Sequence, residues 1–197
     1  LIKKLDNYYD YIVNLSGYVD HSNNKSILKT HFGGCKNLIS IFKKKKLKKF
    51  IQIGSSIENG NQPSPQNENK TIRKTSTYSV YGDAKLKTSR YLKNLFLKEK
   101  VPITILRLYL VYGPYQDNNR IIPFVINNCI KKNFFNCSPG NQYRDFVFVD
   151  DVVKAIYQSL RSKNSDGEII NIGNGTPIKI KNLINKIRNL VGHGNPN

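Results

Sequence analysis

Short apolar runs alternate with longer stretches of helical periodicity along the whole chain, and this alternation limits the possible folds more than any other feature. Strands that are buried on both faces and joined by crossover helices produce such a pattern, which predicts an α/β fold with a parallel sheet. The predicted strands cover residues 11–15, 50–54, 103–108, 146–149 and 169–172. The predicted helices cover residues 27–42, 79–97, 123–132, 150–160 and 178–190. A polar segment at residues 58–77 predicts a long surface loop, of the kind that often covers an active site.

Length and composition indicate a globular protein. The 197 residues, 39% of them hydrophobic, are enough to bury a core. No apolar stretch reaches the roughly 20 residues that a membrane-spanning helix needs, and the N-terminus lacks the layout of a secretory signal. We therefore expect a cytoplasmic protein without a membrane partner. Cys35, Cys129 and Cys137 form no Cys-x-x-Cys pair, and the histidines show no metal-ligand spacing, so we expect neither disulfides nor a metal site.

The formal net charge of +19 raises the alternative of a nucleic-acid-binding protein, because clustered cations displace counterions from phosphates. Only seven of the 32 basic residues are arginine, and the chain is also rich in Asn and Ile, which an AT-rich genome favours. The densest basic run, at residues 43–49, follows a predicted helix, where cations complement the negative end of the helix dipole. We therefore expect a solvated basic surface and no nucleic-acid partner.

Tyr81 and Lys85 lie four residues apart near the start of the predicted helix 79–97, so both side chains can point from one face. A phenol with a pKa of about 10 is a weak base at neutral pH, but a close ammonium favours its ionised form. This spacing occurs easily by chance in a chain with 12 tyrosines and many lysines. Upstream, however, Ser55 and Ser56 follow the predicted strand 50–54, and ligands bind at the carboxyl ends of strands in open α/β sheets. A hydroxyl there can hydrogen-bond a reacting alcohol or carbonyl, or it can simply begin a turn.

The order strand, serine, loop, Tyr-x-x-x-Lys helix and strand resembles the extended short-chain dehydrogenase/reductase family, in particular its NAD-dependent epimerase/dehydratase branch, which acts on nucleotide-sugars. Further segments resemble this family in order and spacing over nearly the whole chain. They are residues 14–17 at a strand end, 31–38 in a helix, 50–60 around the catalytic serine, 107–114 beside the nicotinamide and sugar, 144–151 with an Arg-Asp-Phe-x-x-Val-Asp-Asp pattern, and 171–173.

The resemblance implies a Rossmann-like, doubly wound domain with a smaller substrate-binding lobe, the cofactor NAD or NADP, and a nucleotide-sugar substrate. It also implies a homodimer formed through the helices at 27–42 and 79–97. The implied catalytic residues are Ser55, Tyr81 and Lys85. Tyr81 would exchange a proton with a sugar hydroxyl while Ser55 orients the reacting oxygen. Lys85 would bind the nicotinamide ribose and keep the pKa of Tyr81 low.

The resemblance assigns binding roles as well. The implied cofactor contacts are Asn14, Ser16, Gly17, Tyr81, Lys85, Leu108 and Leu110. The implied substrate contacts are Ser56, Leu110 and Arg144. Of these, Arg144 would pair with the substrate phosphates, because a guanidinium fork suits phosphate oxygens.

The family's Gly-x-x-Gly-x-x-Gly loop, which brings backbone amides to the cofactor pyrophosphate, does not occur in this sequence. The opening residues align best with the fourth strand of the family, so we expect the chain to be an N-terminally truncated portion that binds NAD(P) poorly by itself. Residues 1–113 and 146–173 would form a partial NAD(P)-binding domain. Residues 114–145 and 174–197 would form an incomplete substrate-binding lobe.

Some positions depart from the family pattern. His31 and Leu110 stand where Asn is usual, and Asn59 stands where Tyr is usual. Leu110 lacks an amide beside the sugar, so the substrate cannot be transferred from the best-known members. Dehydratases place an Asp-Glu pair after the catalytic residue, whereas Ser56 and Ile57 follow Ser55, which favours a 4-epimerase or a 4-keto-reductase. A non-catalytic binding protein on the same fold remains the main alternative, ahead of a nucleic-acid-binding protein.

Overall fold

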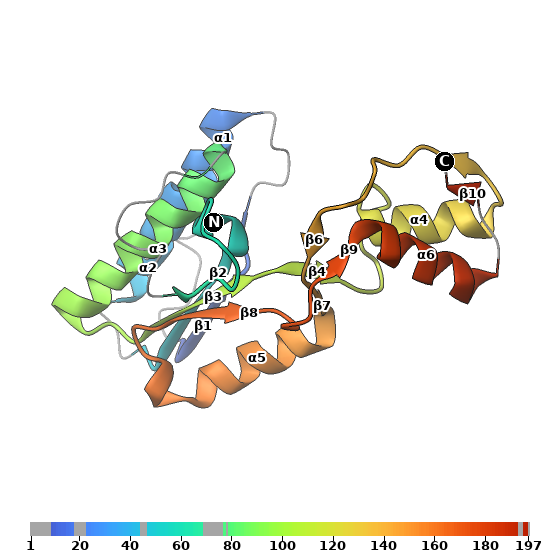
Figure 1. Ribbon diagram of the computed structural model, residues 1–197. Helices are drawn as coiled ribbons and strands as arrows, with labels where there is room; N and C mark the ends of the chain where they lie inside the picture. The colour runs from blue at the N-terminus through green and yellow to red at the C-terminus, as the bar shows by residue number, and fades with distance from the viewer. Residues whose placement is uncertain are drawn as a thin grey trace. The chain divides into compact units, whose positions relative to one another are not determined.

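The computed structural model describes residues 9–17, 23–43, 47–68, 77, 79–192 and 195–196, and the chain divides into two compact units (Figure 1). Unit 1 comprises Leu1–Leu108 and Val153–Ile172, and unit 2 comprises Tyr109–Val152 and Gly173–Asn197. These bounds differ from the predicted division at 113/114, 145/146 and 173/174. The difference arises because residues 110–112 and 146–148 pair with each other, which places both segments in unit 2.

Unit 1 contains a four-stranded parallel sheet of order β1-β2-β3-β8. Its strands are β1 (Tyr11–Asn14), β2 (Lys49–Ser55), β3 (Ile103–Leu108) and β8 (Ile169–Ile172). The two central strands, β2 and β3, are buried along nearly their whole length, since a parallel sheet has covered faces on both sides. The predicted α/β class and four of the five predicted strands are thus confirmed in one sheet.

One long helical stretch follows β1. It consists of α1 (Asn24–Leu28), the π-helix η2 (Lys29–Gly34) and α2 (Cys35–Phe42), and it corresponds to the predicted helix 27–42. The side chain of Asn23 accepts a hydrogen bond from the backbone N–H of Ser26 and so caps α1. A π-turn shifts the backbone hydrogen bonds by one residue. Within this turn, the carbonyl oxygen of His31 accepts a hydrogen bond from the hydroxyl of Thr88 at 3.2 Å.

The second helix of unit 1, α3 (Val80–Glu99), matches the predicted helix 79–97. Ser79 caps it, because its hydroxyl accepts a hydrogen bond from the N–H of Gly82 at 3.1 Å. Lys100, in the left-handed conformation with φ 55°, ends the helix. The preceding predicted loop at 58–77 begins instead as a turn of 3-10 helix, η3 (Ser56–Asn59), and its residues 69–76 lie outside the described residues.

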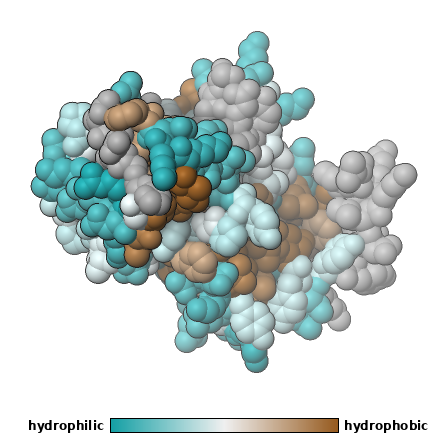
Figure 2. All heavy atoms as spheres, turned by 90° about the vertical axis from the view of Figure 1, so that its right-hand side faces the viewer, coloured by the Kyte–Doolittle hydropathy of each residue, from teal (hydrophilic) through white to brown (hydrophobic). Residues whose placement is uncertain are grey.

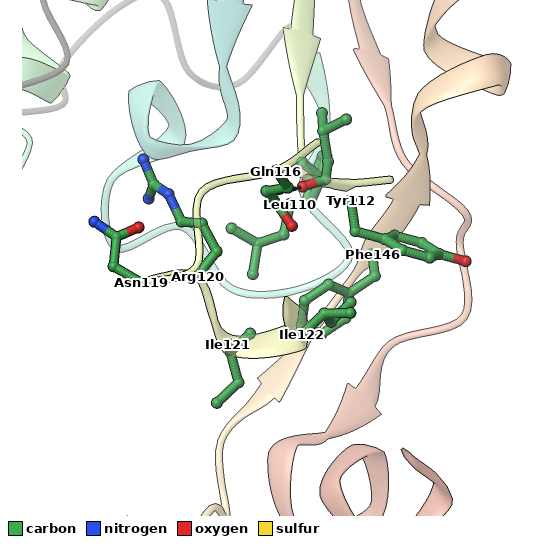
Figure 3. A pocket seen from close by; sticks show the side chains of 10 residues that line it. Leu110, Tyr112, Gln116, Asn119, Arg120, Ile121, Ile122 and Phe146 are labelled. Carbon is green, nitrogen blue, oxygen red and sulfur yellow. Dashed lines mark hydrogen bonds between the residues drawn. The ribbon is translucent and has the colours of Figure 1, made fainter. Parts of the chain in front are cut away.

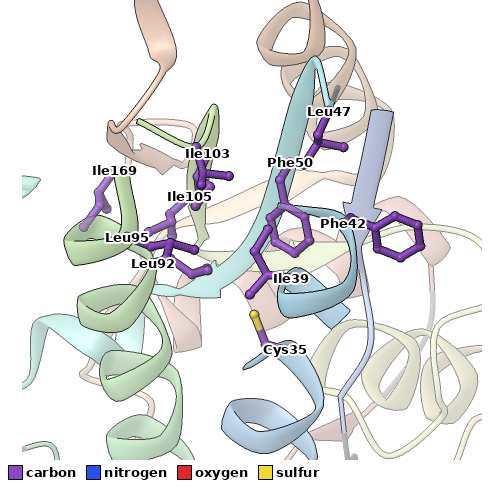
Figure 4. Packing of buried hydrophobic residues seen from close by; sticks show 11 residues of the cluster. Cys35, Ile39, Phe42, Leu47, Phe50, Leu92, Leu95, Ile103, Ile105 and Ile169 are labelled. Atoms are coloured by element: carbon purple, nitrogen blue, oxygen red, sulfur yellow. The ribbon is translucent and has the colours of Figure 1, made fainter. Parts of the chain in front are cut away.

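A hydrophobic core lies between the sheet and the helices α2 and α3 (Figure 4). Ile39 of α2, Phe50 of β2 and Leu92 of α3 have no exposed surface. Burying a side chain of this size stabilises the fold by about 1.5–3 kcal/mol relative to its exposure to water. The other members are Cys35, Phe42, Leu47, Leu95, Val101, Ile103, Ile105 and Ile169. This core fixes α3, and with it Tyr81 and Lys85, against β2 and β3.

Unit 2 is built from short strands and two packed helices. Its strand pairs are β4 (Leu110–Tyr112) with β7 (Phe146–Phe148), β6 (Tyr143–Arg144) with β9 (Ile178–Lys179), and β5 (Phe134–Phe135) with β10 (Asn195–Pro196). Its helices are α4 (Ile121–Ile130) and α6 (Ile180–Val191). They enclose a second core with Val125, Cys129 and Ile184 at its centre. The helix α5 (Val149–Arg161) contains residues of both units and is followed by a 3-10 turn, η5 (Lys163–Ser165).

The surface is mixed in character. On the face drawn in Figure 2, hydrophobic residues lie among hydrophilic ones. Among the large apolar side chains that are well exposed are Ile130, Phe134 and Leu190 of unit 2. In the part of the chain that the structure describes, no helix combines the length and the apolar character needed to cross a membrane.

Candidate active site

The turn that follows β2 is held by two hydrogen bonds of Ser55, one with Glu58 and one with Ile57. The N–H of Ser55 donates to Oε1 of Glu58 at 2.8 Å, and the Ser55 hydroxyl accepts from the N–H of Ile57 at 3.4 Å. This is a capping box, and it explains why the chain turns into the 3-10 helix η3 directly after the strand. Ser55 and Ser56 are both half-buried. The turn therefore places the hydroxyl of Ser55 at the carboxyl end of β2.

Tyr81 and Lys85 lie in the first turns of α3, where the helix start is fixed on both sides. Besides the Ser79 cap, the Asp83 carboxylate accepts hydrogen bonds from the N–H of Thr77 at 3.1 Å and from its hydroxyl at 2.9 Å. Lys85 Nζ donates to the carbonyl oxygen of Ile53 at 2.9 Å. This bond ties α3 to β2 two residues before Ser55, so the structure brings all three predicted catalytic residues to one region of unit 1.

Lys85 is buried beside an aromatic ring. Its Nζ lies 5.8 Å from the centroid of the Tyr81 ring, and the residue is 6% exposed. Burial lowers the pKa of Lys85, because water no longer stabilises the ammonium, while the negative charge of Glu58 acts in the opposite direction. On the other side, the His31 ring meets Tyr81 edge to face at a centroid distance of 5.1 Å.

The predicted cofactor contacts of β1 lie at the carboxyl end of that strand. Asn14 is buried, and its amide donates to Oε1 of Gln52 at 2.7 Å. Its Oδ1 accepts from the N–H and the hydroxyl of Ser16, at 3.2 and 2.6 Å. The Asn14 side chain thus shapes the strand end through bonds within the protein, and it leaves Ser16 and Gly17 exposed. Leu108 is half-buried at the end of β3 and pairs with Ser55 across the sheet.

A cavity of about 440 Å³ lies in unit 2 (Figure 3). Leu110, the predicted contact of both cofactor and substrate, lines it. In Figure 3 the polar side chains of Asn119 and Arg120 lie on one side of this cavity and the aromatic rings of Tyr112 and Phe146 on the other. The remaining lining residues are Tyr109, Val111, Gln116, Ile121 and Ile122. The cavity can therefore hold a ligand that has an apolar face and a polar or anionic group.

Sequence reasoning missed the polar residues of this cavity. Arg120 precedes α4 as its N-cap, and Gln116 and Asn119 stand in the turn before it. The sequence does contain a signal for Arg120, because an arginine just before an apolar helix is placed to bind an anion. The family pattern, however, indicates Arg144 as the phosphate-binding residue. Arg144 lies exposed on β6, where its Nη1 donates to the carbonyl oxygen of Tyr143 at 2.8 Å, and it does not line the cavity.

The residue after Arg144 has a structural role. The Asp145 carboxylate accepts hydrogen bonds from the N–H groups of Asn174 and Gly175, both at 2.9 Å. At Gly173 a Cβ would lie 2.6 Å from Oδ2 of Asp145, so only glycine permits this approach. The Arg-Asp-Phe and Asn-Ile-Gly segments of the sequence thus meet through Asp145.

Within the described residues, no three His, Cys, Asp or Glu side chains gather where they could hold a metal ion. Cys35, Cys129 and Cys137 are free thiols. Burial raises the pKa of Cys35 to about 12, so this thiol stays protonated at neutral pH.

The sequence model of the NAD-dependent epimerase/dehydratase family matches residues 1–173. The chain belongs to this family. The predicted resemblance is thus confirmed, and so is the α/β fold that it implied. The family is NAD-dependent, and its curated members include sugar-nucleotide epimerases and dehydratases.

Two curated relatives and one solved structure illustrate the position of the chain in the epimerase/dehydratase family. It is 33% identical to a putative UDP-glucose 4-epimerase of Methanocaldococcus jannaschii, over 81% of this chain and 52% of the relative. It is 29% identical to a dTDP-D-glucose 4,6-dehydratase of Dictyostelium discoideum, over 92% of this chain and 45% of the relative. The UDP-glucuronic acid 4-epimerase of Bacillus cereus, solved with UDP-glucuronic acid and NAD, superposes with a TM-score of 0.85 at 25% identity, over 95% of this chain and 62% of that one. The chain spans about half the length of the curated relatives it matches.

Proposed function

We propose that this chain is the catalytic portion of a nucleotide-sugar 4-epimerase or 4-keto-reductase, with Ser55, Tyr81 and Lys85 as its catalytic residues. The observation that carries the proposal is the hydrogen bond from Lys85 Nζ to the carbonyl oxygen of Ile53. It holds the ammonium 5.8 Å from the Tyr81 ring and next to the strand end that carries Ser55. Unit 1 would thus supply the chemistry, and unit 2 would supply substrate recognition.

Each catalytic residue has a distinct task in this proposal. Tyr81 exchanges a proton with the hydroxyl at the reacting sugar carbon, acting as general base in one direction and general acid in the other. Ser55 donates its hydroxyl proton to the same sugar oxygen and so orients it, from a strand end that the capping box holds in place. The positive charge of Lys85 stabilises the phenolate form of Tyr81, because the buried ammonium lies 5.8 Å from the centroid of the Tyr81 ring.

The residues of unit 1 fit a nicotinamide cofactor. An ammonium has three N–H groups, and Lys85 uses one of them for Ile53 among the described residues, which leaves donors for the hydroxyls of a ribose. Ser16, Gly17 and Leu108 lie at the carboxyl ends of β1 and β3, the edge of a parallel sheet at which nucleotides bind. When bound, NAD or NADP accepts or returns the hydride of the sugar carbon.

The cavity of unit 2 suits a nucleotide-sugar. Arg120 can pair with phosphate oxygens, and the apolar wall with Leu110 and Phe146 suits the flat faces of a base or sugar ring. Arg144, exposed on β6, remains a second candidate for the phosphates. Because the side chain of Leu110 cannot form a hydrogen bond where an amide is usual, we infer a substrate that presents no hydroxyl to this wall.

Glu58 favours the epimerase or reductase over a 4,6-dehydratase. A dehydratase needs an acidic group close after the catalytic serine to protonate the leaving hydroxyl. The one carboxylate in the turn 55–59 is that of Glu58, which has no exposed surface and is bound to Arg107 at 2.9 Å. A carboxylate enclosed in this way cannot reach a substrate.

The test is turnover by the purified full gene product. UDP-, GDP-, CDP- and dTDP-sugars are supplied with NAD or NADPH, and the products are followed by the absorbance of the reduced cofactor and by NMR of the sugar. Tyr81→Phe should abolish turnover of the accepted substrate. Tyr91→Phe is the matched control, because it removes a hydroxyl from the same helix at a ring that packs on Phe32.

Binding of a nucleotide-sugar without turnover, unaffected by Tyr81→Phe, would contradict the proposed enzymatic function and favour the non-catalytic binding protein.

Pairing of two copies through the helical stretch 24–42 and α3 is part of the proposal as well. Leu28 and Leu97, which are 41% and 56% exposed, offer apolar surface for it. Sedimentation of the wild type against a Leu28→Glu variant tests this pairing.

A further inference from the structure

An ion pair without any contact to water lies directly beneath the proposed catalytic serine. Glu58 and Arg107 both have fully buried side chains, and Nε of Arg107 donates to Oε2 of Glu58 at 2.9 Å. Taking two charges out of water is expensive, and replacing such a pair with apolar side chains of similar volume is often neutral or stabilising. Fold stability alone therefore gives no reason for this pair.

The remaining bonds of the carboxylate point to a different role. Oε1 of Glu58 accepts the N–H of Ser55 at 2.8 Å. Oε2 accepts, besides Arg107, the hydroxyl of Ser89 at 2.7 Å. One side chain thus joins the end of β2, the strand β3 and the helix α3.

The bond to Ser89 reaches the catalytic face of α3. Ser89 lies four residues after Lys85, which lies four residues after Tyr81, so the three side chains follow one face of the helix. The bond from Lys85 to Ile53 fixes α3 to β2, and the bond from Ser89 to Glu58 fixes α3 to the turn η3 that follows β2. The position of Ser55 relative to Tyr81 depends on both.

The carboxylate of Glu58 lies close against Gly54. A Cβ at Gly54 would lie 2.5 Å from Oε1 of Glu58 and 3.3 Å from Cγ of Arg107. Arg107 Nη1 also donates to Oδ1 of Asn59 at 3.1 Å, which fixes the far end of the turn η3. A carboxylate held by three hydrogen bonds, from Ser55, Arg107 and Ser89, is a rigid support for the groups that it binds.

We propose that Glu58 is a positioning residue, whose buried carboxylate, oriented by Arg107, holds Ser55 in place against the helix that carries Tyr81 and Lys85. The inference rests on the proposed function of Ser55. It predicts that replacing both charged residues changes the free energy of unfolding little, but leaves the backbone of Ser55 less well ordered.

The test uses two variants and one control. Glu58→Met leaves the charge of Arg107 buried and unpaired, and it serves as the reference for misfolding. The double variant Glu58→Met/Arg107→Met removes both charges with side chains of similar length, so it should fold. Asp166→Asn is the matched control, because it breaks the ion pair of Asp166 with the buried Lys49 at the other end of β2.

Two measurements separate positioning from stability. Amide hydrogen exchange of Ser55, measured by NMR without cofactor, should be about tenfold faster or more in the folded double variant, because its N–H has lost its acceptor, and unchanged in the control beyond the change in global stability. In the full enzyme, kcat should fall about tenfold or more with little change in KM in the double variant only.

The outcomes are distinguishable from failure of the proposed function. Unchanged exchange at Ser55 in the folded double variant overturns the proposal, and so does an unchanged kcat. If the wild type shows no turnover, the exchange measurement still decides whether Glu58 holds Ser55. If the double variant does not fold although both charges are gone, Glu58 and Arg107 serve the fold itself and the proposal is wrong.

Discussion

The imidazole of His31 and the phenol ring of Tyr81 meet edge to face, with 5.1 Å between their centroids. His31 is 6% exposed and lies in the π-helical segment of the helical stretch 24–42. A buried aromatic contact of this kind orients a ring as well as stabilising it. His31 is therefore placed to set the direction of Tyr81.

Replacing His31 with Ala should lower the free energy of unfolding by about 1–3 kcal/mol, through lost packing and lost aromatic contact. It should also shift the NMR resonances of the Tyr81 ring. Phe32→Ala removes a comparable edge-to-face contact, with Tyr91 at 5.8 Å, and serves as the control. Equal shifts of Tyr81 in both variants would show that His31 has no special effect on that ring.

Lys85 makes the stability of unit 1 depend on pH. Burial lowers its pKa below the ordinary 10.5. Between the lowered pKa of the folded state and that ordinary value the unfolded chain binds more protons, so the contribution of Lys85 to the free energy of unfolding rises with pH. The stability of the wild type minus that of Lys85→Met should therefore be larger near pH 10.5 than at neutral pH, as measured by urea unfolding. Lys87→Met on the same helix gives the baseline, and a difference that falls with pH would contradict the burial of the charge.

Gly54 and Gly34 should respond in opposite ways to alanine. At Gly54 the new Cβ would meet Oε1 of Glu58 at 2.5 Å, so Gly54→Ala should destabilise the protein by about 1–3 kcal/mol. At Gly34, with φ −59° and ψ −47°, a Cβ meets nothing within 4 Å. Gly34→Ala should stabilise by about 0.5–1 kcal/mol, because alanine loses less backbone entropy in a helix. Thermal unfolding of the two variants side by side checks both signs, and a stabilising Gly54→Ala would mean that the Glu58 carboxylate has room to move.

If the cavity of unit 2 binds the substrate, Arg120→Ala should weaken the binding of the accepted nucleotide-sugar about tenfold or more, since a charge-assisted bond to phosphate is lost. Arg144→Ala is expected to do the same if that residue also meets the phosphates. Arg161→Ala, which removes an exposed guanidinium bound to Tyr157, should leave affinity unchanged. Isothermal titration of the three variants at one ionic strength compares them, and an equal loss in all three would indicate a general effect of charge.

The main sheet and the long helices were predictable because each carries a strong local signal. The strand 103–108 is apolar except for Thr104 and Arg107. The helix α3 begins with a serine cap and has an acidic residue in its first turn. Paired strands of two or three residues, such as β5 and β6, are too short for any periodicity to show. Their location depends on contacts between distant residues, and so does the boundary between the two units.

The candidate site divides in the same way. Ser55, Tyr81 and Lys85 could be proposed from spacing and order, but their support could not. Glu58 and Arg107 are 49 residues apart in the sequence. Charged residues normally lie at the surface, so nothing in the sequence predicts that either of them is buried. The parallel pairing of β2 with β3 brings them together next to Ser55.

The π-helical turn at 29–34 determines which neighbours the two ends of the helical stretch face. A π-turn is what remains when one residue is inserted into an α-helix, and successive α-helical residues are rotated by about 100°. Deleting either Gly33 or Gly34 would restore an ordinary helix, but it would turn His31 by about that angle relative to Cys35 and the core behind it. The irregular turn thus allows one helix to face two directions, toward the hydrophobic core at one end and toward Tyr81 at the other.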